Sequence, residues 1–167
     1  VMRERYAESD SPLVVHRLDM DTSGLMVIAK TMSAYRHLQR QFARHEIRKR
    51  YVALLSHDLD QTGGTICLPL RPDLSDRPRQ VVDEVYGRYA ETRYERIGPC
   101  RVALYPLTGR THQLRVHCAH RAGLNNPISG DALYGQRSDR LYLHAEEITF
   151  RHPVTGEWVS FKAEAAF

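Results

Sequence analysis

The segment Leu13–Lys30, "LVVHRLDMDTSGLMVIAK", places a dense polar stretch between two apolar runs. The apolar runs, residues 13–15 and 25–29, predict two strands. A hairpin needs only a few turn residues such as Asp or Gly to reverse direction. This stretch holds a histidine, an arginine, two aspartates, a threonine and a serine, and so carries more polar chemistry than a turn requires.

Length and composition are those of one globular domain. The 167 residues are 42% hydrophobic and 26% charged, which argues against intrinsic disorder. No apolar run approaches the roughly 20 residues of a membrane span, and the first ten residues, "VMRERYAESD", contain no apolar signal segment. We therefore expect a soluble, cytoplasmic protein without a membrane partner.

Cysteine usage and charge bear on the class of ligand. The three cysteines form no CxxC pair, which favours neither a disulfide framework nor a zinc ribbon. The net charge is +4, and the segment 36–50, "RHLQRQFARHEIRKR", holds six Lys/Arg and one acid. This run suits a phosphate backbone, but a solvated helix face explains it equally well.

Hydrophobic periodicity predicts a helix within this basic segment. Ser33 is a candidate N-cap, and Ala34, Leu38 and Phe42 recur at helical spacing. The other side of this helix carries Arg36, Arg40 and Arg44.

The rest of the chain reads mainly as strands. Strands are expected at 51–55 and 63–70, in a hairpin turning at Gly98 and Pro99, and in a final pair within 140–165. Residues 71–82, with two prolines, read as a loop, and Thr111 is a candidate cap for a helix over 112–122 that Gly123 would end. Sequential strands that outnumber helices indicate an α+β class with a mixed, mostly antiparallel sheet.

Asp19 and Asp21 are the first candidates for chemistry. A lone carboxylate is ionised at neutral pH and can act as a nucleophile without a base to activate it. The i, i+2 spacing in a loop gives little support to a glycosidase-type acid/base pair. From this segment alone, hydrogen-bonded turn aspartates are the simpler interpretation.

A second cluster, "TGRTHQLRVHCAH", spans residues 108–120. Its His117 and Cys118 point in different directions on a helix, and no second ligand group has a recognisable spacing, so we expect no metal. Arg110 lies at the junction of a strand and a helix, where a bend can aim a guanidinium inward. A buried arginine needs a carboxylate partner, whereas a surface arginine in a turn does not.

Taken together, these segments resemble the RluA-type RNA pseudouridine synthases. The matching stretches are "HRLDMDTSGLMVIAK" from His16, "KRYVAL" from Lys49, "RPRQ" from Arg77, "GRYAETRY" from Gly87, "LTGRTHQLRVH" from Leu107, "PISGDALYG" from Pro127 and "LYLHA" from Leu141. They occur in the family's order from Pro12 onward. The "RPRQ" and "GRYAETRY" stretches are most similar to the branch with dual rRNA and tRNA specificity.

The resemblance implies a pseudouridine synthase fold with a central catalytic cleft, and it implies roles for single residues. Asp19 would be the essential carboxylate, and Asp21 a structural residue. Tyr51 would pack against the target base and is a candidate for proton transfer. Arg110 would pair with Asp19 and keep it ionised, and Leu143 would line the pocket.

The implied reaction suits these residue types. Uridine becomes pseudouridine when the C1′–N1 bond breaks, the uracil turns over, and C5 bonds to C1′ after losing its proton. Because no atoms are gained and no redox change occurs, we expect no cofactor and no metal. Asp19 would attack C1′, attack C6 of the ring or remove a ribose proton, and the sequence leaves these routes open.

The resemblance also implies an RNA partner. A base in folded RNA must be extruded to be modified, so cations must hold the strand. The candidates for binding substrate or RNA, besides Leu143, are Arg17, Thr22, Arg36, Arg40, Arg44, Lys49 and Arg50. Arg17 alternatively pairs with a loop carboxylate.

Two features separate this chain from its relatives. Asn126 stands where most relatives have histidine, and relatives have further strands before this region. We therefore interpret residues 1–167 as one catalytic domain, a monomer, without an N-terminal portion found in relatives. An alternative is an RNA-binding or assembly module whose pocket is idle, although such a module has no evident need for Asp19, Tyr51 and Arg110 together.

Overall fold

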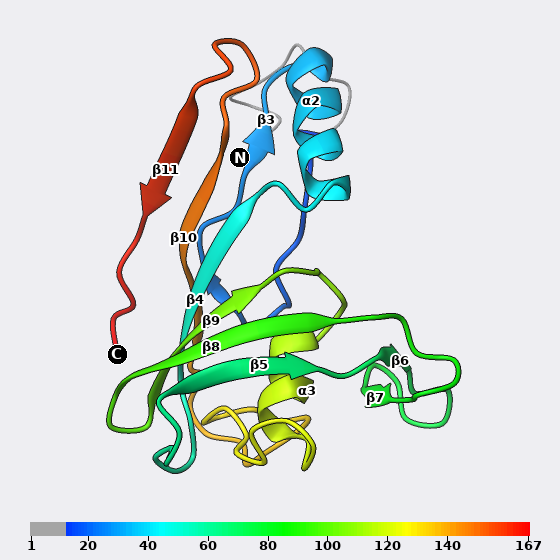
Figure 1. The fold of residues 1–167 in the computed structure, drawn as a ribbon, viewed down its shortest axis with the longest axis vertical. Helices are drawn as coiled ribbons and strands as arrows, with labels where there is room; N and C mark the ends of the chain where they lie inside the picture. The colour runs from blue at the N-terminus through cyan, green and yellow to red at the C-terminus, as the bar shows by residue number, and fades with distance from the viewer. Residues whose placement is uncertain (1–12) are drawn as a thin grey trace.

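The computed structural model describes residues 13–167 as a central sheet with two helices and two small hairpin-like strand pairs (Figure 1). The expectations for the first ten residues lie outside the described range. The main sheet has the order β11-β10-β4-β9-β8-β5, with β2 pairing to β10. In this order, the strands are β11 (Trp158–Lys162), β10 (Leu143–Arg151), β4 (Arg48–Leu54), β9 (Arg101–Pro106), β8 (Glu91–Gly98) and β5 (Gly63–Cys67).

All neighbours along this path are antiparallel, and only β2 joins β10 in parallel. The predicted α+β class with a mixed, mostly antiparallel sheet is therefore confirmed. The predicted hairpins are confirmed as well, because β8 pairs with β9 and β10 pairs with β11.

The opening segment folds as more than a turn. β1 (Leu13–Val14) pairs with β3 (Ile28–Ala29), as the two apolar runs predict. Between them, β2 (Ser23–Gly24) adds to β10, which the sequence did not reveal. A Cβ on Gly24, whose φ is +114°, would lie 2.3 Å from the Ala145 carbonyl oxygen, so glycine allows this close approach.

Helix α2 (Met32–Ala43) forms where periodicity predicts it, but one residue before Ser33. The N-cap is Thr31, whose hydroxyl oxygen accepts a hydrogen bond from the Ala34 backbone N–H at 3.2 Å. The predicted Ser33 cap is wrong, since the chain enters the helix earlier. Leu38 is buried, and the helix packs its apolar face beside β3 (Figure 1).

Helix α3 (Gln113–Ala119) is shorter than predicted at both ends. Its N-cap is His112, in a left-handed conformation without a side-chain capping bond, so the predicted Thr111 cap is wrong. The helix ends at His120, which is extended, before Gly123 is reached. Tertiary bonds of the buried Gln113 side chain fix the start of this helix instead of a local cap.

The segment predicted as a loop contains two strands. β6 (Leu70–Pro72) pairs antiparallel with β7 (Gln80–Val82) and forms an arm beside the main sheet (Figure 1). Pro72 and Pro78 concealed these short strands, because proline argues against strand pairing in sequence analysis. The arm joins the body through Leu70, which is buried against Val116.

Two large apolar clusters stabilise the fold, and the second includes apolar residues of the opening segment. One includes Leu104, Leu114 and Leu143 beneath the main sheet, and the other includes Leu38 and Phe150 beside α2. β4 and β10 run past both halves of the molecule (Figure 1). Neither helix in residues 13–167 is long and apolar enough to span a bilayer.

Candidate active site

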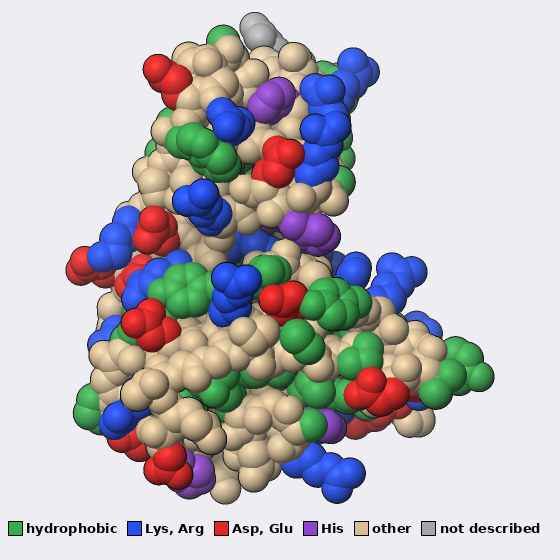
Figure 2. Space-filling view, viewed as in Figure 1, with side chains coloured by type: hydrophobic (Ala, Val, Ile, Leu, Met, Phe, Trp, Pro, Cys, Tyr) green, Lys and Arg blue, Asp and Glu red, His purple; other side chains and the backbone are tan. Residues whose placement is uncertain are grey.

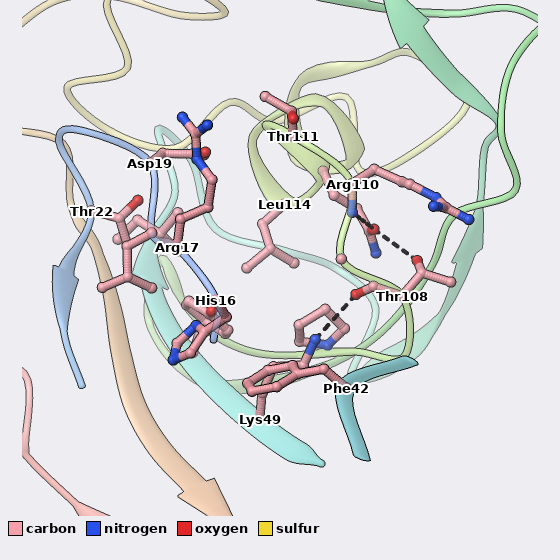
Figure 3. Close-up of a pocket in the computed structure, with 16 residues that line it drawn as sticks. His16, Arg17, Asp19, Thr22, Phe42, Lys49, Thr108, Arg110, Thr111 and Leu114 are labelled. Carbon is pink, nitrogen blue, oxygen red and sulfur yellow. Dashed lines mark hydrogen bonds between the residues drawn. The ribbon is translucent and has the colours of Figure 1, made fainter. Parts of the chain in front are cut away.

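A cavity of about 260 Å³ lies between the half of the molecule that contains α2 and the half that contains α3. Its walls are residues 16–19 and Thr22 of the opening segment, Phe42 of α2, Lys49 and Tyr51 of β4, residues 106, 108–111, 113 and 114, and Leu143 of β10. Figure 3 shows these side chains converging from separate elements. The cavity collects the predicted site residues Asp19, Tyr51, Arg110, Arg17, Thr22, Lys49 and Leu143.

Asp19 is held at the cavity wall by a turn that is tied to the sheet. The Thr22 backbone N–H donates to the Asp19 carbonyl oxygen at 3.0 Å. The turn is then anchored to β10, because the Leu25 N–H donates to the Ala145 carbonyl and Ser23 Oγ lies 2.9 Å from His144 Nδ1. The polar residues of the opening segment thus position Asp19, whereas Asp21 is exposed.

Tyr51 lies in the middle of the sheet and faces Asp19. Tyr51 pairs with Ala145 on one side and with Leu104 on the other, so its backbone position is fixed within the sheet. Burial and the negative charge of Asp19 raise the pKa of the Tyr51 hydroxyl to about 12. The phenol is therefore protonated at neutral pH and can donate a hydrogen bond.

Arg110 does not pair with Asp19 in this structure, contrary to the prediction. Its Nε donates to the Tyr89 carbonyl oxygen at 3.0 Å, and its backbone N–H donates to Gln113 Oε1 at 3.0 Å. The side chain extends away from Asp19 (Figure 3), and no ion pair between Arg110 and Asp19 is formed among the described residues. The bonds to Gln113 turn this loop so that Arg110 reaches the cavity rim.

Arg115 is the buried arginine that the sequence analysis missed. It is 3% exposed and binds the carboxylate of Asp131 through Nε at 2.8 Å and an amino group at 2.6 Å. Burial opposes its charge, but the bonds and charge of Asp131, together with the charge of Asp19, raise its pKa. Arg115 is therefore a buried cation whose direct partner is Asp131, and Asp19 contributes more weakly to its charged state.

His112 and Tyr134 connect this arginine to the β6–β7 arm. His112 Nδ1 lies 2.8 Å from the Tyr134 hydroxyl, which accepts a bond from the Gln80 N–H at 2.7 Å. Burial lowers the pKa of His112, although Asp19 acts in the opposite direction. Arg115 also lies over the Tyr134 ring, 5.3 Å from its centroid. Arg115 and Tyr134 both lie in stretches that resemble the family, so the sequence marked them as residues of interest. Their contact with each other could not be predicted, because it depends on the fold.

The predicted RNA-binding residues divide into three groups. Arg17, Thr22 and Lys49 line the cavity. Arg36 and Arg40 of α2, together with its C-cap residue Arg44, are exposed, and Figure 2 shows a column of blue side chains along this helix. Arg50 lies on the opposite face of β4 from the cavity residues, where it pairs with Glu146 and its Nε lies 3.4 Å from the Tyr105 hydroxyl.

The remaining candidates for chemistry have structural surroundings. Cys118 is fully buried, and burial raises the pKa of its thiol. Within residues 13–167, no cluster of three or more His, Cys, Asp or Glu has an arrangement suited to a metal ion. Asn126 exchanges hydrogen bonds with the His57 backbone at 3.0 and 2.7 Å, which fixes the neighbouring loop.

Comparisons with known proteins define the class. Residues 2–120 match the family model described as RNA pseudouridylate synthase. The chain is similar in structure to human RNA Pseudouridylate Synthase Domain Containing 1, with a TM-score of 0.81, 29% identity and coverage of 98% of this chain and 71% of the other. Human RNA Pseudouridylate Synthase Domain Containing 4, at 23% identity, shares the fold with a TM-score of 0.77 over 98% of this chain and 75% of that one.

Curated relatives narrow the assignment. The Dual-specificity RNA pseudouridine synthase RluA of Pasteurella multocida (strain Pm70) is 45% identical over 162 residues, covering 91% of this chain and 73% of the relative. The protein of the same name from Escherichia coli (strain K12) is 42% identical over 172 residues, covering 97% and 76%. The chain belongs to the RluA family of RNA pseudouridine synthases and is therefore an RNA-modifying isomerase.

Proposed function

We propose that this enzyme converts specific uridines in both ribosomal and transfer RNA into pseudouridine, with Asp19 as its catalytic carboxylate. The observation that carries the assignment is the position of Asp19 on the cavity wall, where its charge acts on Tyr51, His112 and Arg115. The dual substrate range is supported by similarity to relatives named for dual specificity. We keep as predictions that the enzyme acts as a cytoplasmic monomer.

The reaction follows from groups in the cavity. Asp19 assists departure of the uracil from C1′, either by bonding to C1′ or C6 or by removing a ribose proton. Tyr51 stacks on the released base, where an aromatic face contributes roughly 1–3 kcal/mol. The Leu143 side chain provides an apolar wall. The Arg115–Asp131 ion pair adds a buried positive charge whose pKa responds to Asp19.

RNA binding requires cations beyond the cavity. We assign Arg17, Thr22 and Arg110 to the entrance, where they contact the flipped nucleotide and its neighbours. The stripe Arg36, Arg40 and Arg44 holds the backbone of the adjoining helix. We do not assign Arg50 to RNA binding, because its guanidinium is paired with Glu146 on the opposite face of β4 from the cavity.

The test is release of tritium from RNA labelled at uracil C5. The wild type should release tritium from both rRNA and tRNA substrates, and Asp19→Asn should abolish release while leaving RNA binding intact. Asp21→Asn is the matched control, because Asp21 is exposed in the same turn, and it should retain activity. Undiminished release from Asp19→Asn would rule out its catalytic role, and release from only one RNA class would rule out dual specificity.

A further inference from the structure

Lys49 is a cavity residue whose position the assigned roles do not explain. It lies two residues before Tyr51 on β4, so both side chains face the cavity, while Arg50 faces the other way. Its Nζ donates to the Thr108 carbonyl oxygen at 3.3 Å (Figure 3). The ammonium is thus fixed at the floor of the cavity, opposite Asp19 in this view.

This ammonium lacks a carboxylate partner among residues 13–167. The ion pairs of those residues do not include Lys49, and its Nζ donates to the neutral Thr108 carbonyl oxygen. Burial lowers the pKa of Lys49 to about 8. At neutral pH the group is therefore still charged, and that charge is poorly compensated until something negative enters the cavity.

The chemistry supplies such a charge at the base. Whether Asp19 attacks C1′, attacks C6 or takes a ribose proton, electron density moves onto the uracil ring and its carbonyl oxygens O2 and O4. We propose that Lys49 is a further catalytic residue, whose ammonium contacts a uracil carbonyl oxygen and stabilises this negative charge. The proposal rests on the proposed function, since it requires a uridine beside Tyr51.

The bond changes balance without another reactant. The C1′–N1 bond breaks, and its electron pair stays on the uracil, shared among N1, O2 and O4 beside Lys49. The ring then turns, and C5 bonds to C1′. This new bond replaces whatever bond or positive charge C1′ carried after the C1′–N1 bond broke. The proton leaves C5, and N1 gains a proton, so uridine and pseudouridine have the same atoms. The ammonium keeps its three protons throughout.

A fixed cation at this place acts like an oxyanion hole. A preorganised donor directed at developing charge contributes more in the transition state than in the substrate complex, because neutral uridine presents only carbonyl dipoles. Removing one such donor typically lowers kcat by about 10²–10³-fold. A cation that only held an RNA phosphate would change KM and the salt dependence of binding instead.

The experiment compares Lys49→Met, Lys49→Arg and the exposed control Lys162→Met in single-turnover tritium release. We expect Lys49→Met to lower the maximal rate constant about 100-fold with less than about threefold change in the RNA concentration for half-saturation. The maximal rate constant of Lys49→Arg should be at least about tenfold higher than that of Lys49→Met. Lys162→Met, on β11, should match the wild type. A rate within about threefold of wild type for Lys49→Met, or a loss confined to RNA affinity and its salt dependence, overturns the proposal.

A pH profile gives a second readout. The titratable or charged groups facing Lys49 are His16, Arg17 and Asp19 from the opening segment, Tyr51 from β4 and Arg110 from the loop before α3. The pKa of His16 is lowered to about 4 and that of Tyr51 is raised to about 12, so neither titrates near pH 8. Because the protonated ammonium is the active form, wild-type rates should fall as the pH rises through about 8.

In Lys49→Arg this alkaline limb should disappear, because a guanidinium stays charged. An unchanged limb in Lys49→Arg overturns the proposal. The failure of the proposed function looks different, because the wild type itself would then release no tritium. Lys49→Met should fold at least as stably as wild type at pH 7, since it removes a buried charge without a carboxylate partner, and a denaturation curve verifies this.

Discussion

Arg115 and Asp131 form a buried ion pair. The two residues are 3% and 0% exposed, and Asp131 also accepts hydrogen bonds from the Leu133 and Tyr134 backbone N–H groups. Breaking a buried pair leaves an uncompensated charge, which costs more than the pair gains over an apolar replacement. The pair therefore fixes the position of Arg115, and a mutation that removes either partner should destabilise the fold.

Asp131→Ala should lower the free energy of unfolding by about 3–5 kcal/mol, because Arg115 would remain buried without its carboxylate. Urea denaturation measures this loss. The matched control is Asp76→Ala, which removes the exposed partner of Arg79 and should cost much less. Equal losses in both variants would contradict a structural role for the buried pair.

Helix α2 shows how one element serves both the core and the substrate. Its apolar side packs into the cluster around Leu38, while its arginines lie exposed at four-residue intervals. Because the helix brings Phe42 to the cavity wall, RNA held along α2 lies next to the cavity entrance. This element therefore links backbone binding to base capture.

Replacing Arg36, Arg40 and Arg44 together by Gln should weaken RNA binding and reduce the slope of log K against log salt by roughly 2–3. Helicity should persist, because Gln and Arg have similar helix propensities. Filter binding at several salt concentrations measures the slope, and circular dichroism measures the helix.

The control for this change replaces three exposed cations elsewhere, Arg121, Arg137 and Lys162, by Gln. It removes the same net charge but leaves α2 intact. If both triple variants lose affinity equally, net charge rather than the α2 stripe holds the RNA.

At the scale of the molecule, each half contains a histidine that burial keeps neutral. His16 stacks on Phe42 in the half that contains α2, and its Nε2 accepts the Val27 N–H at 2.9 Å. His117 lies fully buried in α3, with Nε2 3.3 Å from the Leu68 carbonyl oxygen. Burial is the main reason that the pKa of each is lowered to about 4.

The free energy of unfolding should therefore fall as the pH is lowered from about 6.5 to about 4. In that window the unfolded chain binds protons that the folded chain excludes, so the loss reaches about 2 kcal/mol per histidine at pH 5. Denaturant titrations at pH 7, 6 and 5 measure the trend. A constant unfolding free energy over this range would contradict it.

The order of elements is visible in the sequence because it depends on local patterns. Alternating and helical spacing predicted α2 and the hairpins β8–β9 and β10–β11, since burying one face requires that periodicity in the chain itself. β2, the β6–β7 arm and the ends of α3 were missed or misplaced. Each depends on distant partners, such as Ala145 beside Gly24 and the buried contacts of Gln113.

The sequence by itself determined the family motifs, the sheet class and several of the polar residues that line the cavity, Asp19, Lys49 and Tyr51 among them. Only the tertiary structure decided which arginine of this motif is buried against a carboxylate, because Arg110 and Arg115 stand five residues apart and look equally suitable. The loop before α3 bends Arg110 towards the Tyr89 carbonyl, while the helix buries Arg115 against Asp131. Likewise, strand alternation within β4 faces Lys49 into the cavity and Arg50 towards Glu146, and pairing with both neighbouring strands fixes that choice.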